Sequence, residues 1–277
     1  MRSRSVLGAA LSAAAVSLAC AAPSLAAPAR AGGIFIPTHA GETLPVHGGT
    51  ATSLNWSGYA VTPSTPDITA VSSSFTVPTA NVLINPLGFA ATWTGIGGYS
   101  TSDLIQAGVT ENTPLTGALS GGQYYAWYEM LPASETPITS GCTGDPSCTV
   151  TPGDDVTVHI TNAGANAWTI AIADAGKWTW SKTVSYSSSE SSAEWILEAP
   201  TVGAQSSLAD VGTVHFGPTS TYTAGGVTHT IAQGNPTQLD LSPLPIAGLF
   251  NEATPSALAA DGESFNDCAY AQSCPTP

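Results

Sequence analysis

The chain has 277 residues, of which 43% are hydrophobic and only 9% are charged, and its formal net charge is -14. A chain of this length and hydrophobic content can bury a sizeable core, which excludes a disordered protein. The acidic balance excludes a nucleic-acid-binding protein and disfavours contact with anionic membranes. Because the chain has only five Lys and Arg residues, its folding depends little on ion pairs that acid would break.

The chain opens with the pattern of a secretory signal peptide. Arg2 and Arg4 precede an apolar run, and small residues suited to cleavage follow it. We therefore predict a secreted, extracellular protein that has no membrane segment after cleavage and acts as a monomer. The predicted organisation is a signal peptide (1–26), a flexible arm or short pro-segment rich in Gly, Pro, Ala and His (27–52), and a single domain (53–277).

From Leu54 onward, short runs rich in Val, Ile, Thr, Tyr and Trp alternate with Gly, Pro, Asn and Ser. Many short strands at this spacing predict an all-β fold, an antiparallel sandwich or barrel. The best helix candidate is the short segment 255–260, and the serine run at 187–192 is expected to form a loop. The predicted strands lie near 56–62, 67–77, 88–97, 103–111, 122–131, 154–162, 167–174, 178–187, 192–198, 211–216, 227–232 and 237–241.

A polar amide lies in the middle of the run over 103–111. If this run is a strand, alternation places Gln106 on the face opposite an apolar set, Ile105, Ala107 and Val109. Few residues of this chain are charged, so a polar amide inside a strand-forming run needs an explanation. A functional site on that face of the strand would explain it.

The next run, 122–131, interleaves polar and aromatic residues on one face. Rings bind an extended substrate while a carboxylate orients it, so this face has the composition of a groove floor. Trp56 and Trp93 could join it. Alternation fits equally well with tryptophans that fill the space between two sheets. The face carries Gln123, Tyr125, Trp127, Glu129 and Leu131.

Four cysteines remain after the predicted cleavage. An even number in an exported chain suggests disulfides, and local pairing is the simplest of the three possible connectivities, which stay open. The five histidines form no zinc-ligand spacing with each other or with the cysteines, so we expect no metal and no cofactor. The four cysteines are Cys142, Cys148, Cys268 and Cys274.

The run over 192–198 places two carboxylates on one face. As a strand it has Glu194 and Glu198 on one side, while Ala193, Trp195 and Leu197 lie on the other. We predict that Glu194 meets the amide at position 106 across a groove. Glu198 is expected to form hydrogen bonds or orient substrate, and a solvated surface carboxylate is the alternative.

Five segments in order resemble the glutamic peptidases, the eqolisin family. The resemblance implies a secreted, acid-acting endopeptidase that hydrolyses polypeptides, built as a sandwich of two curved antiparallel sheets with a substrate groove on the concave face. It implies a catalytic dyad of Gln106 and Glu194, and substrate-cleft residues at Trp56, Trp93, Trp127 and Glu129. The segments are Asn55-Trp56-Ser57-Gly58-Tyr59, Trp93-Thr94-Gly95-Ile96-Gly97, Ile105-Gln106-Ala107-Gly108-Val109, Tyr125-Ala126-Trp127-Tyr128-Glu129 and Ala193-Glu194-Trp195-Ile196-Leu197-Glu198.

The sequence departs from the family pattern at three positions. Gly97 stands where the family commonly has an aspartate after its Trp-x-Gly-Ile run. Tyr125 stands where an aspartate can precede the Ala-Trp-Tyr-Glu run, and Leu131 replaces an aromatic residue. None of the three belongs to the dyad, so the departures concern the hydrogen bonds around the groove and the subsite preference.

The dyad also makes chemical sense without the family. A glutamate with an ordinary pKa of ~4.3 can take a proton from water in mild acid and then pass one to the leaving nitrogen. A glutamine amide can donate to a developing oxyanion and does not titrate, so its donor persists in acid. Glu194 and Gln106 would fill these two roles.

Two other functions use similar residues. A β-sandwich glycosidase could use two carboxylates, such as Glu129 and Glu194, beside tryptophan platforms. A non-catalytic carbohydrate-binding protein could use the same rings without chemistry. Other protease classes fit poorly, because the sequence has no Gly-x-Ser-x-Gly elbow, no His-Glu-x-x-His motif and no pair of Asp-Thr/Ser-Gly loops.

Overall fold

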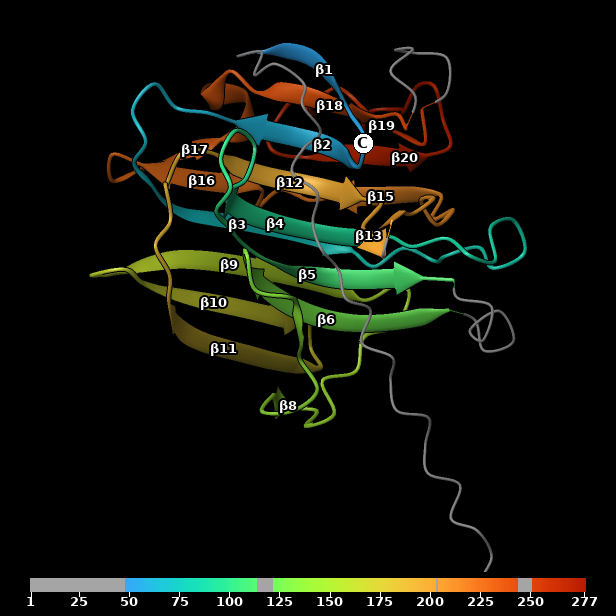
Figure 1. The fold of residues 1–277 in the computed structure, drawn as a ribbon, viewed down its shortest axis with the longest axis horizontal. Coiled ribbons are helices and arrows are strands. Elements are labelled where there is room, and N and C mark those ends of the chain that lie inside the picture. Colours follow the sequence, from blue (N-terminus) through green and yellow to red (C-terminus); the bar gives the residue numbers. More distant parts are fainter. Residues whose placement is uncertain (1–47, 114–121, 203, 244–250) are drawn as a thin grey trace, which may run out of the picture. The chain divides into compact units, whose positions relative to one another are not determined.

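The computed structural model describes residues 48–113, 122–202, 204–243 and 251–277, which form an all-β fold dominated by antiparallel pairing (Figure 1). The predicted fold class is confirmed. In these ranges the helical structure is a single 3-10 turn, η1 (Ile231–Gly234). No helix in the described part of the chain is long and apolar enough to span a membrane.

The strands make two layers that share one edge. Strand pairing defines the order of what we call the first sheet: β1 (Gly49–Ser53), β18 (Thr237–Leu241), β2 (Trp56–Val61), β12 (Ala193–Glu198), β4 (Ala91–Gly97), β5 (Leu104–Asn112), β6 (Gln123–Met130) and β7 (Thr136–Pro137). The second sheet consists of β17 (Val227–Thr230), β16 (Thr221–Ala224), β3 (Ile68–Thr76), β9 (Asp155–Gly164), β10 (Ala167–Asp174), β11 (Trp178–Ser185) and β8 (Thr143–Gly144).

Three strands link the two sheets at their shared edge. They run from β18 through β19 (Ala253–Pro255) and β20 (Phe265–Ala269) to β15 (Thr213–Phe216), which pairs with β3. A separate small hairpin joins β13 (Thr201–Val202) to β14 (Ala204–Gln205). Each predicted strand run overlaps one of these strands, whereas β16 and β20 lie outside every predicted run.

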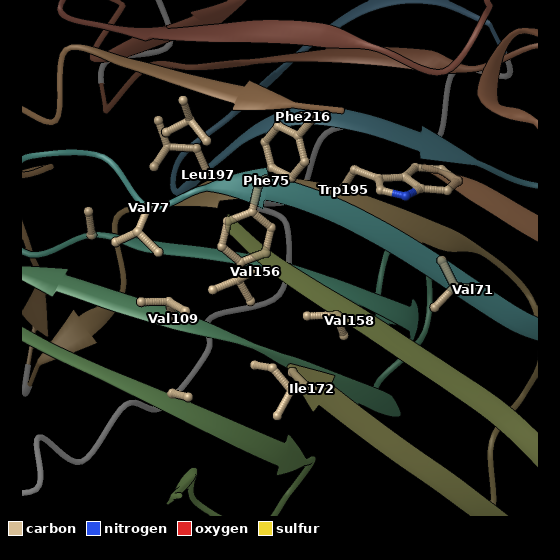
Figure 2. Close-up of a cluster of buried hydrophobic side chains, with 14 of the residues drawn as sticks. Val71, Phe75, Val77, Val109, Val156, Val158, Ile172, Trp195, Leu197 and Phe216 are labelled. Atoms are coloured by element: carbon tan, nitrogen blue, oxygen red, sulfur yellow. The ribbon is translucent and has the colours of Figure 1, made fainter. Parts of the chain in front are cut away.

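The main hydrophobic core lies between the two sheets (Figure 2). Trp195 and Leu197 enter it from the first sheet, and Phe75 and Phe216 meet there with ring centroids 5.9 Å apart. Each fully buried side chain of this kind stabilises the fold by about 1.5–3 kcal/mol. The predicted alternation in β12 is therefore confirmed, because its apolar face is the one that fills the core.

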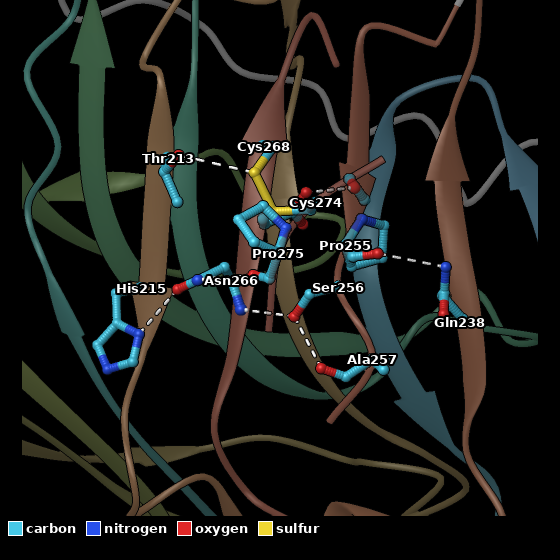
Figure 3. The surroundings of a disulfide bond; sticks show 12 residues. Thr213, His215, Gln238, Pro255, Ser256, Ala257, Asn266, Cys268, Cys274 and Pro275 are labelled. Atoms are coloured by element: carbon cyan, nitrogen blue, oxygen red, sulfur yellow. Dashed lines mark hydrogen bonds between the residues drawn. A yellow bond between two sulfur atoms is a disulfide. The ribbon is translucent and has the colours of Figure 1, made fainter. Parts of the chain in front are cut away.

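Both disulfides are local. Cys142 bonds to Cys148, and Cys268 bonds to Cys274. The second bridge holds the end of the chain against β20 (Figure 3), where Asn266 Nδ2 also donates a 2.8 Å hydrogen bond to the Pro275 carbonyl. The simplest of the predicted connectivities is therefore the one that forms.

Two predictions about local structure were wrong. The segment 255–260 is not a helix, since Ser256 N donates to the Asn266 carbonyl and continues the pairing beside β20. Strand β1 begins inside the predicted arm and ends at Ser53, because Gly49 to Ser53 pair in parallel with β18. The predicted loop at 187–192 is confirmed. The division into signal peptide, arm and domain otherwise stays a prediction, as residues 1–47 lie outside the described residues.

A buried carboxyl fastens the C-terminal strand β20 to β2. Asp267 is completely buried, and its Oδ1 accepts a 2.7 Å hydrogen bond from Ser57 Oγ. Burial raises the pKa of Asp267 well above its ordinary value, while the hydrogen bond from Ser57 acts in the opposite direction. Ser57 makes this contact on the core side of β2, whereas Trp56 lies on the opposite face of the same strand.

We expect Ser57→Ala to lower the free energy of unfolding by about 1–3 kcal/mol, because it leaves the Asp267 carboxyl without its donor. Ser73→Ala is the matched control, since Ser73 is equally buried and its hydroxyl has no hydrogen-bond partner among the described residues. Urea unfolding of both variants measures the difference. Equal losses in the two variants would contradict the proposed contribution of the Ser57 hydrogen bond.

Candidate active site

The predicted pair lies in one row that crosses four strands. Glu194 on β12 pairs with Gly95 on β4, Gly95 pairs with Gln106 on β5, and Gln106 pairs with Glu129 on β6. Directly opposed residues of neighbouring strands project on the same face. With strands about 4.8 Å apart, the backbones of Glu194 and Gln106 are ~10 Å apart, within reach of two long side chains.

Gly95, which has no side chain, lies between these two residues in the row. A Cβ atom built at this position would lie 3.0 Å from Gln106 Cβ and 3.0 Å from the Ile105 carbonyl oxygen. Both contacts are tighter than side chains normally tolerate. The absence of a side chain on the central strand therefore leaves room for Gln106 and for Leu104, whose Cδ1 atom also lies 3.0 Å from this position.

The outer face of the first sheet, which faces away from the second sheet, carries a second apolar cluster. Trp56, Trp93 and Trp127 belong to it, whereas Trp195 fills the space between the sheets. The rings of Trp56 and Trp93 meet edge to face with centroids 5.0 Å apart. The alternative in which Trp56, Trp93 and Trp127 fill the space between the two sheets is therefore wrong, and their role in a groove stays a prediction.

Glu198 is buried on this face and held by hydrogen bonds. Its Oε2 accepts a 2.8 Å bond from Trp93 Nε1, and its Oε1 accepts a 3.2 Å bond from Asn55 Nδ2. Burial raises the pKa of Glu198 to about 7, although the contacts from Trp93, Trp56 and Asn55 counteract this rise. The surface-carboxylate alternative for Glu198 is wrong, because only 3% of the residue is exposed.

Glu129 holds the amide of Gln106. Gln106 Nε2 donates a 2.6 Å hydrogen bond to Glu129 Oε2, and both residues are buried. Burial, followed by the charge of Glu198, raises the pKa of Glu129 to about 8. Glu129 therefore carries a proton in acid while it still accepts the bond from Gln106.

Burial also raises the pKa of Glu194 well above its ordinary value. The charge of Asp103 adds to the rise, while contacts to the Ser192 side chain and the Tyr99 backbone oppose it. The expectation of an ordinary pKa near 4.3 was therefore wrong. Sequence alternation placed Glu194 beside apolar neighbours but could not show that the carboxyl is completely buried.

The departure at Gly97 has a local explanation. Gly97 has a φ of +87°, and a Cβ built there would lie 2.9 Å from Asp103 Oδ2. The carboxyl of Asp103 therefore occupies the space next to this position, where it also accepts a 2.6 Å hydrogen bond from Ser189 N. In this chain Asp103, rather than a residue at position 97, places a carboxyl near Glu194.

Glu135 also lies at this site, although no sequence pattern predicted it. Its Oε1 accepts a 2.8 Å hydrogen bond from Tyr125 Oη, and burial raises its pKa to about 8. Glu135 lies on the connection between β6 and β7, outside any alternating run, so no pattern could place it on this face. It lines a cavity of about 10 Å3 together with Ala91, Gln106, Trp127, Glu129, Glu198 and Pro200.

Nothing in the described ranges forms a group of three or more His, Cys, Asp or Glu side chains able to hold a metal ion. The carboxyls on the outer face lie instead beside amide, indole and phenol donors. These donors stabilise the ionised carboxylates, whereas burial favours the neutral form, so the carboxyls are suited to hold and release protons in general acid–base chemistry.

A model of the Peptidase A4 family matches residues 54–242. The chain belongs to this family. It is a peptide-bond hydrolase of the glutamic endopeptidase class, which confirms the predicted family and enzyme class and sets aside the glycosidase and carbohydrate-binding alternatives. No curated protein sequence matches the chain.

Solved structures of glutamic peptidases have the same fold. Scytalido-glutamic peptidase with a transition-state analogue inhibitor matches with a TM-score of 0.60 and 18% identity, over 78% of this chain and 98% of that chain. A second structure of that enzyme, with a peptide-based transition-state analogue, gives 0.59 and 19% with the same coverage. SCP-B, described as a member of the eqolisin family in complex with the tripeptide Ala-Ile-His, gives 0.57 and 20%, again over 78% and 98%.

We expect the free energy of unfolding to be highest in acid and to fall as the pH rises. The pKa values of Glu129 and Glu135 are raised to about 8 and that of Glu198 to about 7, from an ordinary value of 4.5. Between about pH 4.5 and pH 8, the folded protein therefore binds more protons than the unfolded chain. The stabilisation is fully present below about pH 4.5 and is lost as the pH rises through 7 to 8.

Urea unfolding at a series of pH values measures this dependence. A Glu129→Gln/Glu198→Gln double variant is expected to flatten the curve, because glutamine carries no titrating proton. Stability that increases from pH 4.5 to 8 would show that these carboxyls are not protonated in the folded state.

Proposed function

We propose that the protein is a secreted, acid-acting endopeptidase in which Gln106 and Glu194 form the catalytic dyad. The observation that carries the proposal is the row in which Glu194 and Gln106 flank Gly95 on one face of the first sheet. Membership of the Peptidase A4 family supports peptide-bond hydrolysis. The substrate is an unfolded or extended polypeptide.

Gln106 stabilises the oxyanion. One N–H of its amide is engaged by Glu129 at 2.6 Å, which leaves the second N–H to donate to the oxygen of the tetrahedral intermediate. Because an amide does not titrate, this donor works at any acidic pH. Its fixed orientation means that little reorganisation is needed when the charge develops.

Glu194 takes a proton from the attacking water and then delivers one to the leaving nitrogen. Only its ionised form can act as the base, and burial raises its pKa well above the ordinary value. The ratio kcat/KM is therefore expected to increase with pH on the acid side of the profile, up to the pKa of Glu194.

Trp56, Trp93 and Trp127 bind the polypeptide, while Glu129 and Glu198 orient it and its catalytic partners. The apolar cluster on the outer face supports this assignment, since it is continuous with the row that holds the dyad. The groove that would receive the chain stays a prediction, because the cavity between these residues measures only about 10 Å3.

Acid action and secretion are supported by different observations. Carboxyls with raised pKa values surround the proposed dyad, so they are neutral in acid. Two disulfides and the signal-like pattern over residues 1–26 support export.

Glu194→Gln is expected to abolish hydrolysis of an unfolded protein substrate, and Gln106→Ala to slow it by about 100- to 1000-fold, the usual cost of one lost oxyanion donor. Hydrolysis is measured with the purified secreted form across roughly pH 2 to 8, in the presence of EDTA and pepstatin. Activity that resists both inhibitors and depends on Glu194 supports the dyad.

Conservative variants of the neighbouring carboxyls provide the control. Glu129→Gln and Glu198→Gln should slow turnover without abolishing it. If either variant is inactive while Glu194→Gln retains activity, the roles of the carboxyls are reversed. Full activity in correctly folded Gln106→Ala would exclude the oxyanion role.

We also expect Gly95→Ala to lower kcat/KM by about 100-fold, because the added methyl group would project between Gln106 and Glu194. Overpacking of this kind costs about 1–3 kcal/mol of stability, so thermal unfolding is measured in parallel. A folded Gly95→Ala protein with unchanged kinetics would show that the space above Gly95 is not used in the reaction.

A further inference from the structure

Glu135 fastens the connection after β6 to the strand that carries Glu129. Its side chain accepts the 2.8 Å hydrogen bond from Tyr125 Oη, and its backbone contacts the Glu129 carboxyl. Tyr125 and Glu129 lie on the same face of β6, four residues apart. The connection therefore folds back over the end of the strand, and Glu135 makes contact at both points.

The cavity beside these residues is too small to be a substrate pocket. Its volume of about 10 Å3 is at the lower limit for a single water molecule. Glu129, Glu135 and Glu198 therefore pack as a polar support around Gln106. A substrate side chain could not enter without displacing them.

The orientation of the Gln106 amide depends on this support. Its Nε2 donates to Glu129 Oε2, whereas its buried Oε1 has no hydrogen-bond partner among the described residues. An amide with one anchoring bond can rotate when its partner moves. The position of the Glu129 carboxyl therefore decides where the second N–H of Gln106 points.

From these contacts we infer that Glu135 is a positioning residue, which fixes the Glu129 carboxyl so that Gln106 presents its free N–H toward Glu194. The inference rests on the proposed function of Gln106. Glu135 itself touches neither Gln106 nor substrate in this role. It acts through Glu129, and Tyr125 holds it in place.

The charges around the cluster favour this arrangement in acid. Burial raises the pKa of both Glu129 and Glu135 to about 8, and the charge of Glu198 contributes to both shifts. The three carboxyls are neutral in acid and can pack together without mutual repulsion.

Glu135→Ala removes the contact with Tyr125, and Glu135→Gln keeps an oxygen that can accept it. Tyr125→Phe removes the same hydrogen bond from the other side. Glu263→Ala, in the turn before β20, is the matched control, because it truncates a carboxyl outside this cluster. The measurements are kcat and KM for a peptide substrate, thermal unfolding, and the 15N–1H resonances of the Gln106 side-chain amide, assigned with Gln106→Ala.

We expect Glu135→Ala to lower kcat by about 10-fold with KM nearly unchanged, since an oxyanion donor acts mainly in the transition state. The Gln106 amide resonances should move toward those of a free amide. Glu135→Gln should restore both quantities, Tyr125→Phe should shift both in the same direction as Glu135→Ala, and Glu263→Ala should leave both unchanged.

A rise in KM with unchanged kcat would overturn the inference and make Glu135 a substrate contact. Unchanged kcat and unchanged Gln106 resonances in Glu135→Ala would also overturn it. If Glu135→Ala does not fold, Tyr125→Phe carries the same test. If folded Gln106→Ala keeps full activity, the proposed function fails, and the Gln106 resonances still decide whether Glu135 positions the amide.

Discussion

Burial of carboxyl groups on an apolar sheet face is the constraint on which the site depends. Glu129, Glu194 and Glu198 are at most 3% exposed, and each has a raised pKa of which burial is the largest cause. Removing an ionised carboxyl from water costs several kcal/mol unless a cation or strong donors compensate. The face is therefore most stable when its carboxyls are protonated, which makes the stability of the fold depend on pH.

Ion pairs contribute little elsewhere in the part of the chain that the structure describes. Lys177 pairs with Asp154 and Asp174, while Lys182 donates to Tyr128 Oη and lies over its ring. The core between the sheets and the strand ladders carry most of the stability, and neither loses strength when carboxylates are protonated. We therefore expect acid to remove little stability through the loss of ion pairs.

The sequence was sufficient for most strands and for their faces because both follow from local alternation, but no run predicted β16 or β20. The apolar and polar sides of β5, β6 and β12 agree with the structure, since each strand has a core on one side. Local patterns failed where distant residues decide the conformation. Segment 255–260 has short-range helical features, yet pairing beside β20 overrides them, and the polar strand β1 forms because β18 offers it an edge.

The register between neighbouring strands decides whether the candidate residues lie close enough to form a site. Alternation places Gln106 and Glu194 each on the less apolar face of its strand, but it cannot show that both oppose Gly95. A shift of one residue between β4 and either neighbour would turn one of the two side chains into the core. Alternation within a strand also could not predict that Glu135 lies at the site. Glu135 lies beside Glu129 because the connection after β6 folds back over that strand. No periodic pattern of residues in the sequence predicts such a fold-back.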